Sequence, residues 1–504
     1  VTVTDGIIVN GTIKLDGNYP VGTGNVALGN NVFGVGNLSG SNNTAIGAAA
    51  MYDNSTGAWN LAAGYLALEN NTIGSYNVAL GGSALALNTT ASYNTAVGYQ
   101  AGYSNVESGQ NLVYVGHQAG YFQTNGNNTA VGKGAMYGAS GADGAYNVTL
   151  GQESLFSNTT ASYNTAVGYQ AGKLNTTGGS NTVIGSQAGY YNITGSNLVA
   201  VGESAAHNST ADNNIAIGVA SLLATTSGQR NLAVGTSALR TNISGSSNTA
   251  FGYQAGYYAT NSGNTFIGTY AGFYTTGNAN TFVGSNGNYG AGHLVTTGSA
   301  NTILGRYNGN QDGLDLRTSS NNIVLSDGDG VPRVYVNDVG RTFIGTTSTL
   351  GTNPARLEVY TIGSGGRIIQ TKTDTNGNTN HITFNTPSGQ AGQIYTNTLT
   401  TTYGTSSDYR LKENVVDLSD ATTRLKQLTP KRFNFIADVD AKTVDGFLAH
   451  EVQSIVPEAI YGIKDEVDAD GNPVYQGIDQ SKLVPLLVAT IKELEARITA
   501  LEGN

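Results

Sequence analysis

Apolar and polar positions repeat along most of the chain with a period of about 17 residues. The unit runs from an Asn through small and apolar side chains to a closing Gly, as in Asn25 to Gly29, Asn43 to Gly47 and Asn94 to Gly98. Seventeen copies occur, and their closing glycines are 16 to 21 residues apart. The residue before the closing Gly is apolar in every copy, which is typical of a short strand with one buried edge. The pattern predicts a stacked β-solenoid in which these apolar residues form an internal ladder.

Other positions of the unit support stacking. Interior copies carry Ala or Ser three residues after the closing Gly, where only a small side chain fits between two closely approaching walls or chains. The outermost copies carry Val32 and Asn308 there, as capping repeats require. We expect the Asn positions to form an amide ladder and Gly to make the tight corners. At about 4.8 Å per layer the stack would be about 80 Å long.

The period is lost after residue 305. Alternating apolar positions separated by Asp-Gly and Asn-Asp turns predict short strands at 322–326, 333–336, 342–345 and 357–360. Strands through Ile368, Ile382 and Ile394 are expected to continue to about residue 405.

The last hundred residues differ from the rest because they hold half of the chain's charged side chains. Helices are predicted over 415–428, ended by Pro430, and over 446–458. The tail has apolar residues spaced 3, 4, 3, 4, 3, which is a heptad seam. These are Val484, Leu487, Ile491, Leu494, Ile498 and Leu501. The seam predicts a short coiled coil at 482–502; packing of this helix on its own domain is the alternative.

Four segments follow from these patterns. An N-terminal connector covers 1–20, the repetitive shaft 21–305, a β-rich neck 306–405 and a C-terminal domain 406–504. The fold class is mainly β, with an α+β domain at the C-terminus.

Composition narrows the function. Only 11% of the residues are charged and 70 are Gly, yet the 39% apolar residues are arranged periodically, which argues for order. There is no Cys, so disulfides and thiol chemistry are excluded. The formal net charge of −10 makes nucleic acid an improbable partner. We expect neither an N-terminal secretion signal nor a membrane-spanning segment.

The shaft offers little catalytic chemistry. Its seven acidic residues are at least nine positions apart and share no repeat phase, whereas glycoside hydrolysis requires two neighbouring carboxyl groups. They are Asp53, Glu69, Glu107, Asp143, Glu153, Glu203 and Asp212. We expect His117, His207 and His293 to be surface histidines, and we expect no metal and no cofactor.

Tyrosine is abundant, with 29 copies, and many follow the small-residue position, as Tyr103, Tyr121, Tyr190 and Tyr257 do. Packing between layers is the favoured interpretation, and a glycan-stacking stripe is the alternative.

At the junction of the two regions the chain reads Ser406, Ser407, Asp408, Tyr409, Arg410, Leu411, Lys412. This stretch resembles the Ser-Asp-x-Arg-x-Lys cleavage site of the peptidase S74 intramolecular chaperones, found at the C-termini of bacteriophage tail spikes and tail fibres such as endosialidases. Residues 446–452 resemble the Gly-aromatic-aliphatic-Ala-x-Glu-Val signature of that family. The shaft repeats are similar to those of trimeric adhesin heads, which form parallel β-rolls.

The S74 resemblance implies autocleavage of the bond between Ser406 and Ser407, with Ser407 as nucleophile, Lys412 as base, and Asp408 and Arg410 orienting the site. Burial in an assembled trimer would favour the neutral amine that a base requires. From the residues alone, the alternative is that Asp408 caps a helix and Lys412 is solvated. His450 is interpreted as a surface helix residue.

The predicted protein is a homotrimeric phage tail fibre of the virion, made in the host cytoplasm and attached to other tail proteins. It would bind a bacterial surface receptor, either a glycan or an outer-membrane protein. Its C-terminal chaperone would direct trimerisation and act as a single-turnover serine peptidase. A bacterial trimeric adhesin and a polysaccharide-degrading tail spike are the alternatives. The adhesin would need a secretion signal and an outer-membrane strand region after the coiled coil.

Overall fold

The computed structural model describes residues 22–34, 39–106, 110–285, 287–347, 357–359, 379–386, 389–396, 400–436, 440–468 and 471–503. The chain divides into two compact units, Val1–Ile369 and Gln370–Asn504. The strand expected through Ile368 lies outside the described residues, as does Glu107.

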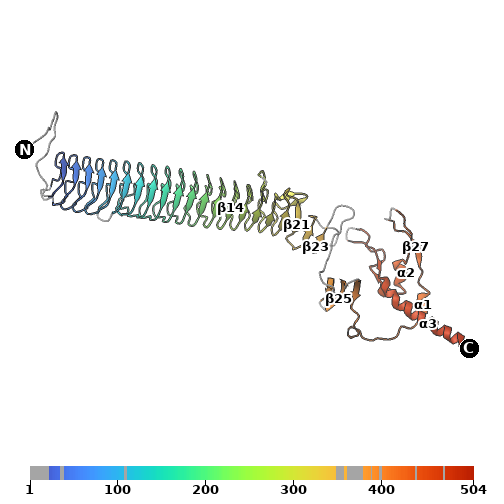
Figure 1. Ribbon diagram of the computed structural model, residues 1–504. Coiled ribbons are helices and arrows are strands. Elements are labelled where there is room, and N and C mark those ends of the chain that lie inside the picture. The colour runs from blue at the N-terminus through green and yellow to red at the C-terminus, as the bar shows by residue number, and fades with distance from the viewer. Residues whose placement is uncertain are drawn as a thin grey trace, which may run out of the picture. The chain divides into compact units, whose positions relative to one another are not determined.

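The first unit contains the β-solenoid that the repeats predict. Within the described residues, seventeen three-residue strands stack in parallel, each paired in register with the same positions of the next turn (Figure 1). One strand is contributed by each of the seventeen repeats. The strands are β1 (Val26–Leu28), β2 (Thr44–Ile46), β3 (Leu61–Ala63), β4 (Val78–Leu80), β5 (Thr95–Val97), β6 (Val113–Val115), β7 (Thr129–Val131), β8 (Val148–Leu150), β9 (Thr165–Val167), β10 (Thr182–Ile184), β11 (Val199–Val201), β12 (Ile215–Ile217), β13 (Leu232–Val234), β14 (Thr249–Phe251), β15 (Thr265–Ile267), β16 (Thr281–Val283) and β17 (Thr302–Leu304).

The side of the strand that faces the core differs from the prediction. From β2 to β17 the middle residue of each strand is fully buried, usually Ala, whereas the residue before the closing Gly points outward. Ile217 is 40% exposed and Phe251 is 56% exposed. The internal ladder is therefore built on the small middle residues, because the interior of a coil this narrow has little room. The predicted apolar ladder exists, but it lies on the outer face of the sheet.

Core volume is balanced between two positions of the repeat. Where the middle residue is the aromatic Tyr114, the residue four positions after the closing Gly is itself Gly, in Gly102 and Gly120. A Cβ at Gly120 would lie 2.4 Å from the Tyr114 ring, so only Gly fits there. Phe266 is accommodated in the same way between Gly256 and Gly272. The repeat thus keeps the interior close-packed while individual residues change.

Two asparagine ladders run through the interior, which confirms the predicted stack. Asn77 Oδ1 accepts from the backbone N–H of Asn94 at 3.0 Å, and Asn60 Oδ1 accepts from that of Asn77 at 2.9 Å. In the second ladder, Asn71 Nδ2 donates to Asn54 Oδ1 at 2.8 Å. These buried amides satisfy the backbone groups of the turns, which a strand of three residues leaves unpaired. The closing glycines are also required: Gly98 has φ +136°, and a Cβ there would lie 2.4 Å from the next closing Gly.

Aromatic side chains stack along the outside of the coil, as interlayer packing predicts. The ring of Tyr121 stacks on Tyr103 at 5.0 Å and on Tyr137 at 5.1 Å between centroids, and Tyr137 stacks on Phe156 at 4.9 Å. These rings cover one another's faces, so the faces needed for sugar stacking are largely occupied within the column.

The parallel stack continues past the last predicted repeat. β20 (Ile323–Ser326) pairs in parallel with β17, and Asn322 extends the first asparagine ladder. β21 (Pro332–Val336) and β22 (Thr342–Ile344) then follow as an antiparallel meander, and β23 (Leu357–Val359) pairs with β22. A short hairpin, β18 (Asn310–Gln311) with β19 (Leu314–Asp315), precedes β20.

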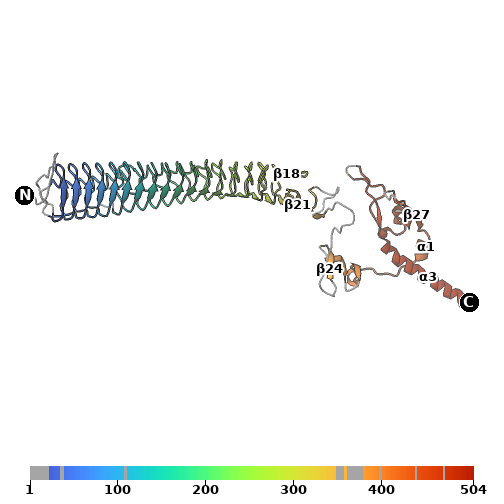
Figure 2. The same ribbon diagram turned by 45° about the horizontal axis from the view of Figure 1, so that its top comes forward.

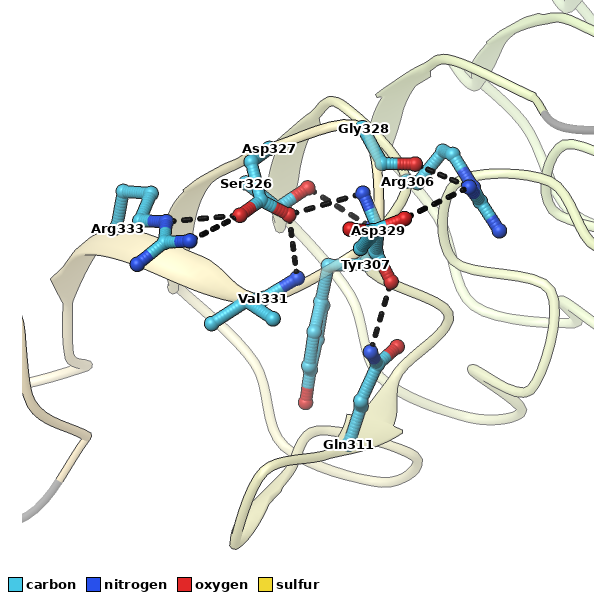
Figure 3. A network of polar contacts seen from close by, with 9 residues as sticks. All are labelled: Arg306, Tyr307, Gln311, Ser326, Asp327, Gly328, Asp329, Val331 and Arg333. Carbon is cyan, nitrogen blue, oxygen red and sulfur yellow. Dashed lines mark hydrogen bonds and ion pairs between the residues drawn. The ribbon is translucent and has the colours of Figure 1, made fainter.

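A polar network holds the turn that changes the direction of the chain (Figure 3). Asp327 accepts from the backbone of Asp329 at 3.0 Å and of Val331 at 2.9 Å, and its other oxygen accepts from Arg333 Nε at 2.8 Å. Arg306 reaches over from the preceding turn to donate to the Gly328 carbonyl. These contacts end the parallel stack with an antiparallel strand, β21, across its last rung.

The second unit begins with an antiparallel sheet of β24 (Thr379–Thr386), β25 (Gly389–Thr396) and β26 (Thr401–Thr405), labelled in Figures 1 and 2. The remaining elements include three α-helices among the described residues. In order they are η1 (Tyr409–Leu411), α1 (Ala421–Leu425), β27 (Lys431–Phe433), β28 (Val444–Gly446), α2 (Ala449–Gln453), η2 (Pro457–Ala459), β29 (Ile460–Tyr461), β30 (Gly477–Ile478), η3 (Gln480–Leu483) and α3 (Val484–Glu502).

The helix predicted over 415–428 is much shorter than expected. Residues 415–418 have no regular structure, and α1 covers only Ala421–Leu425. A small core forms where α1, α2 and α3 meet, and Ala421, Val452 and Leu486 are buried in it. Five residues cannot make a stable helix alone, so α1 depends on these tertiary contacts.

Candidate functional site

The junction at residues 406–412 forms a compact turn that follows strand β26. Asp408 has an extended backbone, with φ −64° and ψ 139°, and precedes the single turn of η1. Its carboxylate accepts from the backbone N–H of Arg410 at 2.9 Å, which is the geometry of an N-cap. The turn ends at Lys412, whose backbone N–H donates to the Tyr409 carbonyl. The capping interpretation of Asp408 is therefore correct for the backbone.

Asp408 and Arg410 also form a two-pronged ion pair. Arg410 Nε donates to one carboxylate oxygen at 3.0 Å, and Nη2 donates to the other at 2.8 Å. The hydrogen bonds from Arg410 hold the pKa of Asp408 below its usual range. The carboxylate is thus engaged by Arg410 and by the backbone, which leaves Lys412 for Ser407.

Ser407 and Lys412 are brought together by this turn. Lys412 Nζ lies 2.8 Å from Ser407 Oγ, within hydrogen-bond distance. The five-residue separation is spanned because η1 folds the chain back, so that both side chains meet on one side of the turn. A serine hydroxyl beside a lysine amine is the nucleophile and base arrangement of Ser-Lys hydrolases.

The whole junction is exposed in a single chain. Ser406 and Ser407, which flank the expected scission point, are exposed, and so is Lys412. Apolar side chains around them are exposed as well: Leu411 is 70% exposed and Val416 is 85% exposed. The nucleophile and base are in contact, but no protein surface of the same chain covers them.

The terminal helix turns its two faces in different directions. Leu486 and Thr490 are buried against the domain, whereas the heptad residues Val484, Leu487 and Ile491 are exposed. Glu493 was expected beside the seam. Instead its carboxylate accepts from the backbone N–H groups of Ala421 at 2.9 Å and Thr422 at 2.8 Å, and so caps α1. The heptad seam therefore does not pack on its own domain.

The other sequence candidates are spread over the molecule. His450 is exposed on α2, as expected of a surface helix residue. His117 is exposed, but His293 is only 7% exposed and stacks on Phe273 at 5.1 Å between ring centroids. Burial lowers the pKa of His293, so the surface interpretation is wrong for this residue. Sequence spacing gave no signal, because the insertion at 285–294 that encloses His293 breaks the repeat.

One pair of shaft carboxyl groups does meet across neighbouring turns. Burial, and then the charge of Asp53, raise the pKa of Glu69. Glu153 is instead paired with Lys173 at 2.8 Å. In the part of the chain that the structure describes, no three His, Asp or Glu side chains gather as a metal site would require. The described helices include none with the length and apolar character needed to cross a bilayer.

Sequence reasoning missed three features with functional weight. These are the capping role of Glu493, the outward apolar face of the sheet, and a cavity on the shaft beside Gly134. Each depends on side chains from different turns or elements, which no local pattern connects. For the third feature a signal was present, since Gly134 stands where adjacent repeats carry Gln118 and Glu153.

Comparison with known families gives one match. The model of Peptidase_S74, described as the chaperone of endosialidase, matches residues 407–461. The match begins at the nucleophile candidate Ser407 and includes η1, α1 and α2. No curated protein and no solved structure matches the chain.

Proposed function

We propose that a chain with a Peptidase_S74 chaperone-of-endosialidase domain after a seventeen-turn β-solenoid is a trimeric fibre protein of a bacteriophage tail. The domain directs trimerisation and then cleaves the chain before Ser407. The observation that carries the proposal is the 2.8 Å contact between Lys412 Nζ and Ser407 Oγ at the first residue of the matched segment. The fibre would be made in the host cytoplasm and become part of the virion.

Cleavage begins at the hydroxyl of Ser407. Neutral Lys412 takes the hydroxyl proton while Oγ attacks the carbonyl carbon of Ser406, the residue before it. The peptide bond to the Ser407 nitrogen breaks, that nitrogen receives the proton from Lys412, and an ester to Oγ remains. Water then hydrolyses the ester, which leaves a carboxylate on Ser406 and restores the hydroxyl. The reaction consumes its own substrate, so each chain reacts once.

Assembly would switch the reaction on. A lysine in contact with water is mostly protonated and is a poor base, and removal from water favours the neutral amine. In a single chain the junction is exposed and is flanked by exposed apolar residues such as Leu411 and Val416. Contact with neighbouring protomers would bury these side chains and the Ser-Lys pair together. Cleavage would then report that the trimer has formed.

The outer face of the solenoid sheet supports a trimer. The residues on either side of each buried middle residue point outward, and most of them are Val, Ile, Leu or Thr. The stripe runs the length of the shaft, from Val26 and Leu28 at one end to Ile323 and Leu325 at the other, and all four are at least 40% exposed. A continuous apolar surface of this extent is typical of an interface, not of a surface that faces water. We assign it to contact between the three shafts.

A repeated shaft needs an external cue for register. Neighbouring turns are so alike that two shafts displaced by one turn would still match most of their apolar residues. The exposed heptad seam of α3, formed by Val484, Leu487 and Ile491 with the later heptad residues, would align three chains before the shafts zip together. This is the task of the C-terminal domain.

Attachment to a bacterial surface is the proposed role of the finished fibre. Removal of residues 407–504 would leave the sheet β24–β26 and the preceding meander at the end of the cleaved chain, where a receptor could be reached. The receptor would be a surface glycan or an outer-membrane protein, and the other end of the fibre would join further tail proteins.

The proposal is tested by the intact mass of purified wild-type protein under denaturing conditions beside that of Ser407→Ala. Two wild-type fragments divided between Ser406 and Ser407, with the variant whole, are expected. If the wild-type protein forms trimers and stays whole, the peptidase role is wrong and the domain is a permanent trimerisation cap. Native mass spectrometry of the same samples measures the trimer separately.

A further inference from the structure

A ladder of glutamine side chains runs along the shaft, two residues after each closing Gly. Gln118 Nε2 donates to Gln100 Oε1 at 2.9 Å, and Gln187 Nε2 donates to Gln170 Oε1 at 3.1 Å. Gln170 Nε2 donates in turn to Glu153 at 2.9 Å. Each side chain thus donates to the previous turn and accepts from the next, so the ladder has a direction.

The ladder is broken at one turn, where Gly134 occupies the position. This leaves a gap between Gln118 and Glu153, which stand two turns apart, or about 9.6 Å along the axis. The gap opens into a cavity of about 240 Å³ beside Gly134. The side chains that line it are His117, Gln118, Lys133, Tyr137, Glu153 and Phe156.

The two ends of the gap are hydrogen-bond acceptors. Gln118 uses its amide N–H on Gln100, and no described residue donates to its Oε1. Glu153 is held by Lys173 and Gln170, and these hydrogen bonds lower its pKa to about 2, so it is a carboxylate at neutral pH. A ligand in the gap would therefore donate hydrogen bonds in two directions, as hydroxyl groups do.

The rim supplies a cation. Lys133 is exposed, and no carboxylate of the described chain pairs with it. Tyr137 and Phe156 stack on each other, so their ring edges form the apolar wall of the cavity. The volume is below the 300–1,000 Å³ of pockets for drug-sized molecules, so one ring fits and a chain of rings does not.

We propose that this notch binds a single hexuronic acid unit of a surface polysaccharide. Ring hydroxyls would donate to Gln118 and Glu153, and the sugar carboxylate would lie at Lys133. The inference deepens the proposed attachment role by giving it a site on the shaft. It is tested with free sugars on purified protein, so its failure would leave the cleavage and trimer results unaffected.

The neighbouring turns offer the variant that closes the notch. Gln118 and Gln170 adopt φ +57° and +56°, close to the +62° of Gly134, so a Gln is compatible with this backbone. A Cβ at residue 134 would lie 3.4 Å from the Phe156 ring, which is ordinary contact. Gly134→Gln therefore completes the ladder and fills the cavity with the side chain that other turns already carry.

The experiment measures binding of D-glucuronic acid and of methyl glucoside to the full-length trimer by saturation-transfer NMR and calorimetry. Millimolar binding of the acid is expected, with Gly134→Gln raising its Kd at least tenfold. Ser237→Gln, which adds the same side chain at the same repeat position of a distant turn, should leave the Kd unchanged. Lys133→Gln should abolish the preference for the acid over the neutral sugar.

Two results would overturn the proposal. One is equal binding by wild-type protein and Gly134→Gln, which would place the sugar elsewhere. The other is no binding of either sugar by a wild-type protein that is trimeric. A neutral sugar bound as well as the acid would contradict the role given to Lys133.

Discussion

Lys412 Nζ lies 2.8 Å from Ser407 Oγ, although both side chains are exposed in a single chain. The turn η1 therefore places the two groups before any partner is present. Assembly does not need to create their contact. It needs only to remove water and to favour the neutral lysine.

Lys412→Arg separates placement from proton transfer. Arginine can still donate a hydrogen bond to Ser407, but a guanidinium does not lose its proton in proteins. We expect normal trimers that stay uncleaved, with the rate reduced at least a hundredfold. Denaturing mass spectrometry after incubation measures the uncleaved fraction, with Lys426→Arg as the control. Cleavage of the arginine variant at the wild-type rate would exclude Lys412 as the base.

Asp408→Asn tests the ion pair that shapes the turn. An amide oxygen keeps the N-cap hydrogen bond but loses the charged pairing with both nitrogen atoms of Arg410. We expect cleavage to slow by about tenfold while trimer yield is unchanged. Asp417→Asn, an exposed aspartate of the same segment, is the matched control. A wild-type cleavage rate in Asp408→Asn would mean that the backbone turn alone sets the geometry.

Glu493 should make the C-terminal unit sensitive to acid. Hydrogen bonds from Thr422 and Ala421 lower the pKa of Glu493 relative to the unfolded chain. The carboxylate therefore stabilises the fold above its unfolded pKa of about 4.3, and this contribution is lost as pH falls through the lower folded value.

The measurement is the thermal midpoint of the helix signal in far-UV circular dichroism between pH 7 and pH 2. Glu493→Gln should lower the midpoint by a few degrees at pH 7, and its difference from wild type should shrink as pH falls below about 4.3. Glu495→Gln, one turn position away and exposed, should behave as wild type. A difference that is constant with pH would contradict the capping role.

Asn77→Ala should weaken the shaft by about 1–3 kcal/mol, because it leaves the buried N–H of Asn94 without its acceptor. The Ala91 carbonyl loses a donor in the same substitution. Chemical denaturation followed by tyrosine fluorescence measures the cost, with the exposed Asn278→Ala as the control. Equal stability of the two variants would show that the ladder is dispensable at this turn.

Ile217→Lys tests the outward face of the sheet. A charge on this stripe would meet the same stripe of its neighbours, so we expect trimers to give way to monomers or to loosened assemblies. Light scattering after size-exclusion chromatography gives the mass. Gln229→Lys adds the same charge at an exposed position outside the strand, and should remain trimeric. Trimers of unchanged stability in Ile217→Lys would place the interface elsewhere.

Much of the architecture is readable from local pattern because each turn repeats one physical solution. The spacing of Asn94 and Gly98 in every copy determines the number of strands, their parallel stacking and the amide ladder. A backbone at φ +136° with no room for a Cβ admits only Gly, so the closing residue is visible in the sequence itself. The Ser407 motif and the tail heptads are likewise local.

The tertiary structure decided which side of each strand is inside. Alternation places Ala216 and Ile217 on opposite faces, but it does not say which face is the core, and hydrophobicity favours the wrong one. Only the narrow width of the coil selects Ala for the interior and leaves Ile217 outside. The same dependence on neighbouring turns governs the gap at Gly134 and the burial of His293. The capping of α1 by Glu493 joins groups about 70 residues apart, which no local signal can predict. The repeat alone therefore determined the stack, while close packing between its turns decided the core and the surface that partners meet.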